Sequence, residues 1–174
     1  MNNEELAFRA ISHYLKTEQV LEIKPKKPVG ACFVTLYING RLRGCIGTPE
    51  AFEPLEKNII RNAIEAATAD WRFNPVTQDE LPRLTLEVSV LTPLKPYHPK
   101  STASLLSFLS KDKPGLVIEQ SGKRALFLPQ VWKELPEPKE FVTQLCLKAG
   151  LSPTAWQDKN TEFFIFTLKT VSRQ

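Results

Sequence analysis

Hydrophobic and polar residues follow two different periods along this chain, one typical of helices and one typical of strands. In residues 3–16, apolar side chains recur at three- and four-residue spacing, which predicts an amphipathic helix. Residues 54–69 show the same spacing and carry a proline in the first turn, where a helix accepts it. Residues 84–91 instead alternate with a period of two, which predicts a strand with one apolar face. The chain therefore combines both kinds of element.

Two segments have the pattern of β-hairpins. Residues 32–38 and 41–47 are rich in apolar and β-branched side chains and flank Asn39-Gly40. Asn-Gly favours a type I′ turn, because both central positions of that turn need a positive φ. A second hairpin is predicted over residues 116–128, with its turn at Ser121-Gly122.

The remaining pattern completes an α+β prediction. We expect helices at 105–109 and 138–149 and a single closing strand at 162–171. The mixed element order, with its hairpins, favours an α+β class with an antiparallel or mixed sheet and packing helices. We expect one two-lobed domain over residues 1–174, with a division near the proline-rich segment 95–102.

Composition and charge are those of an ordinary soluble protein. The 174 residues are 42% hydrophobic and 24% charged, and no apolar run approaches the roughly 18 residues of a membrane span. The first residues lack the basic and apolar regions of a signal peptide, so we expect a cytoplasmic protein. With 23 basic and 19 acidic residues, the net charge of +4 is compatible with an anionic partner, and supports nucleic acid only weakly.

The cysteines and histidines do not form a disulfide or metal pattern. Cys32, Cys45 and Cys146 are widely spaced and contain no C-x-x-C. His13 and His98 have no ligand spacing to them, so we predict no metal site.

The first hairpin carries the most informative chemistry, because Cys45 lies between two glycines and beside arginines. An uninterrupted register from the turn would place Val34 opposite Cys45 and Leu36 opposite Arg43. One face would then carry Cys45 together with Arg41, Arg43, Cys32, Val34, Leu36 and Ile38. The other face would carry Phe33, Thr35, Tyr37, Leu42 and Ile46, and we expect that face to meet the core.

In that arrangement the arginines Arg41 and Arg43 would favour the Cys45 thiolate or bind an anion. Gly44 and Gly47 would leave room for a ligand or for another stretch of backbone. The alternative is that Cys45 is a small buried hydrophobic residue and the glycines mark a bulge. A redox pair of Cys45 with its diagonal neighbour Cys32 is a weaker alternative, since the thiols of such neighbours are often too far apart.

Other candidate residues lie outside the hairpin. Asp70 follows the second helix, where it would cap the helix or form an ion pair, and Arg72 would pair with Asp70 or with a ligand. The neighbouring Trp71 and Phe73 would pack the helix end or, alternatively, stack on a planar group. Glu87 is a candidate general acid or base, or else a solvated carboxylate. His98 could assist a thiolate, or lie on a loop.

Several of these segments resemble the AMMECR family, which is named after the Alport syndrome, mental retardation, midface hypoplasia and elliptocytosis chromosomal region gene. The resemblance lies in Gly30–Leu36, Asn39-Gly40, the run Leu42-Arg43-Gly44-Cys45-Ile46-Gly47, Ala66-Ala67, Asp70, Arg72-Phe73, Pro75, Glu80-Leu81, Leu86–Leu91, Gly115–Ile118, Gly122, Leu126–Val131 and Leu145–Leu151. It implies an α+β fold of two subdomains and a suspected enzymatic role for the LRGCIG-type motif at Cys45. It also implies, as partners, a Memo-like protein and a radical S-adenosylmethionine enzyme, and it links the fold to nucleotide and nucleic-acid handling.

Three hypotheses follow. The first is an enzyme of unknown cofactor that uses Cys45 as nucleophile or redox thiol on an anionic or nucleotide-like substrate, with proton transfer by Glu87 or His98. The second is a module that binds a nucleotide or RNA without chemistry, although no RRM or KH motif is visible. The third is an adapter that docks onto a Memo-like or radical S-adenosylmethionine partner.

Overall fold

A computed structural model describes residues 1–173, except for the side chains of 171–173. The chain forms two compact units. Unit 1 comprises residues 1–91 and the chain from Lys169 onward, and unit 2 comprises Thr92–Leu168. The chain thus leaves unit 1 a few residues before the proline-rich segment 95–102 and returns to it near the C-terminus.

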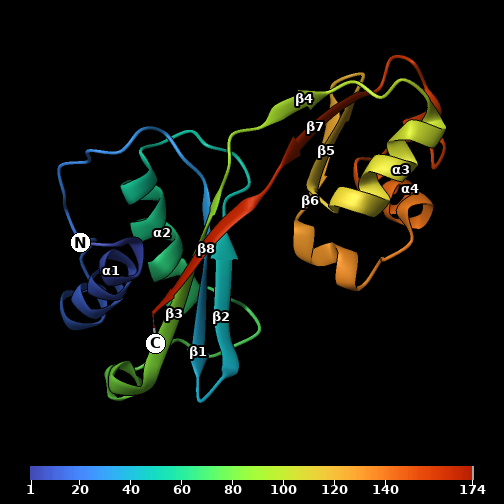
Figure 1. The fold of residues 1–174 in the computed structure, drawn as a ribbon. Coiled ribbons are helices and arrows are strands. Elements are labelled where there is room, and N and C mark those ends of the chain that lie inside the picture. The colour runs from blue at the N-terminus through green and yellow to red at the C-terminus, as the bar shows by residue number, and fades with distance from the viewer. Residues whose placement is uncertain (174) are drawn as a thin grey trace. The chain divides into compact units, whose positions relative to one another are not determined.

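Unit 1 is a four-stranded sheet with two helices on one face (Figure 1). The sheet order is β2-β1-β3-β8, and the first three of these strands pair antiparallel. The elements of the unit are α1 (Asn3–Thr17), β1 (Cys32–Ile38), β2 (Arg41–Gly47), α2 (Leu55–Thr68), the 3₁₀ helix η1 (Gln78–Arg83), β3 (Leu84–Leu91) and β8 (Leu168–Arg173).

The core of unit 1 lies between the helices and that sheet face. Val34 and Leu36 of β1 are fully buried, as are Ile59 and Ala63 of α2. Helix α1 begins with a capping box: the Asn2 side chain accepts a hydrogen bond from the Glu5 backbone N–H, and the Glu5 carboxylate accepts one from the Asn2 backbone N–H. The opposite face of the sheet carries neither α1 nor α2 (Figure 1), and we call it the helix-free face.

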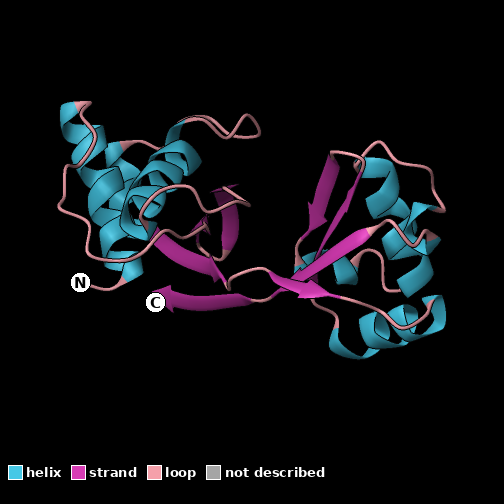
Figure 2. Cartoon of the chain, turned by 90° about the horizontal axis from the view of Figure 1, so that it is seen from above, coloured by secondary structure: helices cyan, strands magenta, loops and turns pink. Residues whose placement is uncertain are grey.

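Unit 2 repeats this plan with a second four-stranded sheet, of order β4-β7-β5-β6. Figure 2 shows its α-helices on one face of the sheet. Its elements are β4 (Lys95–Tyr97), α3 (Thr102–Asp112), β5 (Gly115–Gln120), β6 (Lys123–Phe127), η2 (Pro129–Lys133), α4 (Pro138–Lys148), η3 (Ala155–Gln157) and β7 (Glu162–Phe166). The Trp132 ring stacks on Phe141 with 3.6 Å between ring centroids, at the centre of this core.

The predicted α+β class is confirmed, and the structure corrects some details. The expected single strand 162–171 is two strands, β7 and β8, which belong to different sheets. Residues 95–97, expected to lie in a connector, form β4 on an edge of the sheet, where a proline costs no ladder hydrogen bond. The helix expected at 105–109 begins earlier, because Ser101 caps it.

Two further findings concern the described residues 1–173. They contain no helix that is both long enough and apolar enough to cross a bilayer. The cysteines Cys32, Cys45 and Cys146 are all free thiols.

Candidate functional site

The first hairpin turns where the sequence predicts, but its register changes after two residue pairs. Asn39 and Gly40 have φ values of 50° and 73°, as a type I′ turn requires. Two residue pairs follow the turn in the expected register. A β-bulge then leaves Arg43 with no residue opposite it on β1, so that Leu36 lies opposite Gly44. Cys45 consequently lies opposite Thr35, and the predicted pairing with Val34 is wrong.

Because side chains alternate between faces, this one extra residue moves each β2 side chain beyond the bulge to the other face relative to β1. The expected core face of β1 is wrong: Cys32, Val34 and Leu36 are fully buried against the helices. Cys45 lies with Thr35 on the helix-free face, and its side chain is partly exposed. The thiol is therefore separated by the sheet from the residues expected to surround it.

A row of polar side chains crosses the helix-free face at Cys45. The Cys45 Sγ lies 3.2 Å from the Thr35 hydroxyl oxygen, and Thr35 is in turn paired with Glu87 on β3. Tyr37 lies two residues along β1 on the same face, where burial raises the pKa of its phenol and the charges of Glu87 and Cys45 raise it further. We call Thr35, Tyr37, Cys45 and Glu87 the thiol row.

The loop after α2 holds the backbone of Cys45. The Cys45 backbone N–H donates to Asp70 Oδ2 at 2.9 Å, and Arg72 donates to both oxygens of the same carboxylate at 3.0 and 2.7 Å. Asp70 is 5% exposed. The hydrogen bonds from Arg72, together with the backbone N–H groups of Cys45 and Arg72, hold the pKa of Asp70 well below its usual range despite its burial. Asp70 thus stays ionised and anchors β2.

The guanidinium near the thiol is that of Arg72, not Arg43. The hydrogen bonds to Asp70 raise the pKa of Arg72, and the nearby Cys45 contributes to the rise. Arg43 instead forms a two-bond ion pair with Glu80 at 2.9 and 3.0 Å and donates to the Asn74 carbonyl at 2.8 Å. Arg43 is thus engaged with η1 and the loop before it.

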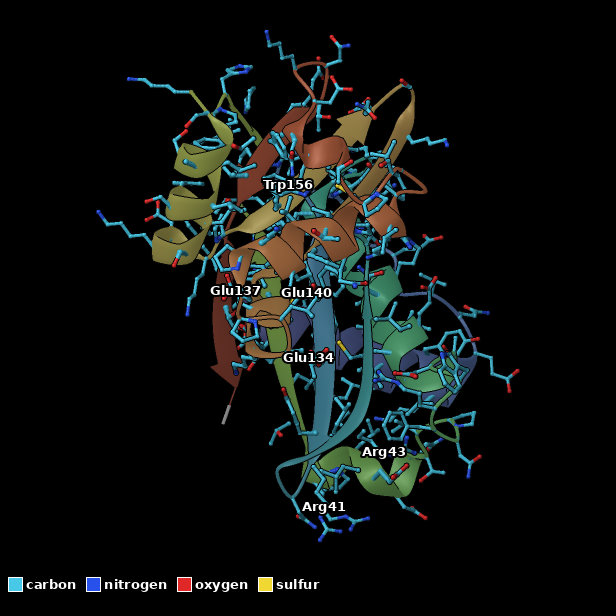
Figure 3. The ribbon with its side chains drawn as sticks, turned by 90° about the vertical axis from the view of Figure 1, so that its right-hand side faces the viewer. Arg41, Arg43, Glu134, Glu137, Glu140 and Trp156 are labelled. Carbon is cyan, nitrogen blue, oxygen red and sulfur yellow. The ribbon has the colours of Figure 1, made fainter. Side chains whose placement is uncertain are left out.

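The other predicted arginine, Arg41, is exposed at the turn end of β2, near Arg43 (Figure 3). Arg41, Arg43 and Arg83 line a pocket of about 530 Å³ between the turn and η1. Within residues 1–173, neither Arg41 nor Arg83 forms an ion pair, whereas the Glu80 carboxylate on the same pocket is occupied by Arg43. This pocket has an uncompensated positive charge.

The two motif glycines are explained by close packing within unit 1. A side chain at Gly44 would collide with the backbone carbonyl of Ala66 in α2. A side chain at Gly47 would overlap the Phe33 ring, which lies across it on the helix-free face. The first glycine lets β2 approach α2, and the second accommodates an aromatic ring beside the thiol row.

The remaining cysteines differ from Cys45 in environment. Cys32 is fully buried beside Asn58 and Asn62, and burial raises its pKa to about 11. Cys146 is buried in unit 2, where burial also raises its pKa. Since Cys32 lies on the core face and Cys45 on the other, the sheet separates the two thiols, and the redox pair is not supported.

His98, the other predicted proton-transfer residue, lies in unit 2. It is exposed on the loop between β4 and α3 and lines a pocket there. The structure thus groups Glu87, Asp70 and Arg72 with Cys45, and places His98, Arg41 and Arg43 in other settings. The described residues contain no cluster of His, Cys, Asp and Glu suited to a metal ion.

Comparison with known proteins gives the family. The family model for AMMECR1 matches residues 4–171. The chain belongs to the AMMECR1 family. A protein of Methanothermobacter thermautotrophicus is 39% identical over 168 residues, which cover 93% of this chain and 88% of that protein. A protein of Methanocaldococcus jannaschii is 43% identical over 169 residues, 92% of this chain and 83% of its own length.

The fold is shared with a solved structure. The crystal structure of an uncharacterised protein from Pyrococcus horikoshii has a TM-score of 0.74 and 34% identity, and it covers 99% of this chain and 90% of its own. The AMMECR1 fold is therefore common to archaeal proteins whose names state no activity.

Sequence reasoning missed two members of the thiol row in this AMMECR1 protein. Thr35 and Tyr37 were expected on the core face, and the uninterrupted register placed Cys45 on the opposite one. The alternation of β3 contains the missing signal, since Leu86 and Val88 pair with Leu36 and Val34 and extend one aliphatic face. Aligning these two strands would have placed Thr35 beside Glu87.

Proposed function

We propose that this AMMECR1-family protein is an enzyme that uses the Cys45 thiol as a nucleophile on the helix-free face of unit 1. The observation that carries the proposal is the setting of Cys45: the residue is partly exposed, and its sulfur lies 3.2 Å from the Thr35 hydroxyl oxygen. Buried structural cysteines have the opposite environment, which Cys32 and Cys146 illustrate in the same chain.

In the proposed reaction the sulfur attacks an electrophilic carbonyl carbon of the substrate. The S–C bond forms, the carbonyl π pair moves to the oxygen, and the thiol proton passes to the Glu87 carboxylate by way of the Thr35 hydroxyl. Thr35 is the neighbour of both residues on the middle strand of the three. The fixed Asp70–Arg72 pair holds the Cys45 backbone and so positions the sulfur.

Arg72 suggests an acidic substrate. Its side chain is 42% exposed, and Nε and Nη2 are used by Asp70, which leaves Nη1 for a ligand. In this proposal Arg72, and not Arg43 as the sequence suggested, favours the Cys45 thiolate and binds the anion.

The test is the rate of alkylation by iodoacetamide in the folded protein, measured by mass spectrometry of the cysteine peptides. Cys45 should react at least about tenfold faster than Cys32 and Cys146 at pH 7, because the thiolate is the reacting form and burial suppresses it at the other two. Thr35→Val should change the Cys45 rate, whereas Thr85→Val, an exposed position on β3, should leave it unchanged. A Cys45 that reacts no faster than Cys146 would refute the proposal.

A second candidate function is the binding of a nucleotide or RNA phosphate at the turn of the first hairpin. The uncompensated Arg41 and Arg83 on the pocket of about 530 Å³ favour it. Binding there should weaken steeply with salt and should be lost in Arg41→Ala/Arg83→Ala. It should persist in Cys45→Ser, which separates it from the enzyme proposal.

A further inference from the structure

Unit 2 contains a pocket of its own at the start of α3, built by residues that the proposed reaction does not use. Its volume is about 330 Å³, at the lower end of the range of small-molecule sites. Leu105, Trp156 and Phe163 form an apolar floor, and each is at most 5% exposed. The pocket lies wholly within residues 97–163 and is independent of Cys45.

One polar group of the floor lacks a partner. The Trp156 side chain, on η3 in unit 2 (Figure 3), is 5% exposed, yet its indole N–H donates no hydrogen bond among residues 1–173. The other buried tryptophan, Trp132, donates its N–H to the Pro114 carbonyl at 2.9 Å, as buried indoles usually do.

The Trp156 side chain lines the pocket, and its indole nitrogen keeps some accessible surface. Among the described side chains, one nitrogen or oxygen atom is both fully enclosed and without a hydrogen-bond partner, and it is an oxygen of Glu4. The unpartnered Trp156 nitrogen is therefore not fully enclosed. The chain covers 95% of Trp156, and the residue belongs to the lining of the pocket, so the proposal assigns its free N–H to a ligand there. A donor is thus held in an apolar floor with nothing to receive its hydrogen bond.

The rim of the pocket carries two lysines beside a histidine. Lys100, Lys159 and His98 are exposed there, and neither lysine forms an ion pair within residues 1–173. Asp158 is the carboxylate on the rim, and one of its oxygens already accepts the Asn160 N–H at 2.9 Å. The rim therefore offers more donors than acceptors.

The N-terminus of α3 adds to this field. The helix has 11 residues and no acidic residue in its first turn. The Ser101 hydroxyl accepts the Ser104 N–H at 3.0 Å, which occupies one of the free N–H groups of the first turn. The positive end of the helix dipole favours an anion beside Ser101 and Thr102, both of which line the pocket.

We infer that this pocket binds a compact planar organic anion. The ring lies against Trp156, Leu105 and Phe163, and an acceptor atom receives the indole N–H. The acidic group, a phosphate or a carboxylate, is held by Lys100, Lys159 and the first turn of α3. An apolar floor and a rim with two lysines match a ligand that combines an aromatic surface with negative charge.

The test uses phenyl phosphate as the probe and the three tryptophan indole N–H signals of the ¹⁵N-labelled chain as reporters, assigned by through-bond experiments on the wild type. The Trp156 signal should move saturably, whereas those of Trp132 and the exposed Trp71 should stay in place. Phenol and inorganic phosphate should each bind at least about tenfold more weakly, because each lacks one half of the ligand. Benzoate distinguishes a carboxylate from a phosphate site.

Variants on the rim keep the test independent of the core. Lys100→Ala/Lys159→Ala should weaken phenyl phosphate binding about tenfold or more. The matched control is Lys111→Ala, an exposed lysine at the other end of α3, which should bind like the wild type. The inference is overturned if the Trp156 signal does not move up to about 10 mM probe. It is equally overturned if phenol binds as well as phenyl phosphate, or if the double variant binds as tightly as the wild type.

Discussion

The two hairpins of this chain have turns of the same kind but differ in how regularly their strands pair. The first turns at Asn39-Gly40 and the second at Ser121-Gly122, and all four residues have positive φ. The second hairpin then pairs without interruption from Gln120 opposite Lys123 to Leu116 opposite Phe127. The first carries a bulge after two pairs. The same turn chemistry therefore leads to one regular and one interrupted ladder.

The comparison shows where the candidate chemistry comes from. In the regular hairpin, alternation from the turn gives the correct face for each side chain. In the interrupted hairpin, the unpaired Arg43 moves Cys45 to the helix-free face, beside Thr35. Bulges often redirect a side chain next to a functional site, and here the redirected group is the thiol.

The largest effect is expected from filling the space that lets β2 approach α2. Gly44→Ala should lower the free energy of unfolding by about 3 kcal/mol, because the new methyl group meets the backbone carbonyl of Ala66, which cannot turn aside. Urea denaturation followed by circular dichroism measures it.

Gly47→Ala is the matched comparison for Gly44→Ala. Its methyl group meets Cγ and Cδ1 of Phe33, and this half-buried side chain can turn away about its Cα–Cβ bond, whereas the Ala66 backbone cannot, so the loss should be smaller. Equal losses at the two glycines would contradict the packing described for the hairpin.

Asp70→Asn, which removes the carboxylate that anchors Cys45, should lower the free energy of unfolding by a smaller amount, on the order of 2 kcal/mol. The pKa of Asp70 is lower in the folded than in the unfolded state, so its contribution is fully present above about pH 4 and is lost as the pH falls through the folded pKa. The difference in unfolding free energy between wild type and Asp70→Asn should therefore shrink from pH 6 to pH 3. A difference that is the same at both pH values would exclude this role.

The smallest expected loss of stability comes from the arginines of the first hairpin, and it should differ between Arg43 and Arg41. Arg43→Ala should lower the free energy of unfolding by about 1 kcal/mol. The ion pair of Arg43 with Glu80 is less than one fifth exposed, and two backbone carbonyls also accept hydrogen bonds from Arg43. Arg41→Ala should change stability by less than about 0.5 kcal/mol, since Arg41 is exposed. Equal costs would mean that Arg43 does not hold the bulge to η1.

Most of the fold could be predicted from local patterns. The α+β class, both turns and the helices near 3–16, 54–69 and 138–149 follow from period and turn residues, and the structure has them. Local patterns could not show that 162–171 divides between two sheets, because both halves are extended and no glycine or proline lies between them. The division depends on which distant strands each half joins.

The site was less predictable than the fold for one physical reason. Residue types drew attention to Cys45, Asp70, Arg72 and Glu87, and the structure gathers these four. Their spatial relation depends on the bulge, which forms because Gly44 packs on α2 and Arg43 reaches Glu80. Both contacts are distant in sequence, so the turn alone could not reveal them.

The position of Cys45 is tested most directly by a disulfide on the helix-free face. Thr35→Cys places a second thiol opposite Cys45, where the native atoms lie 3.2 Å apart, whereas Val34→Cys places it where an uninterrupted register would need it. After mild oxidation, peptide mapping by mass spectrometry should find a cross-link to Cys45 in Thr35→Cys and not in Val34→Cys. A cross-link in Val34→Cys without one in Thr35→Cys would contradict the bulged register and the thiol row built on it.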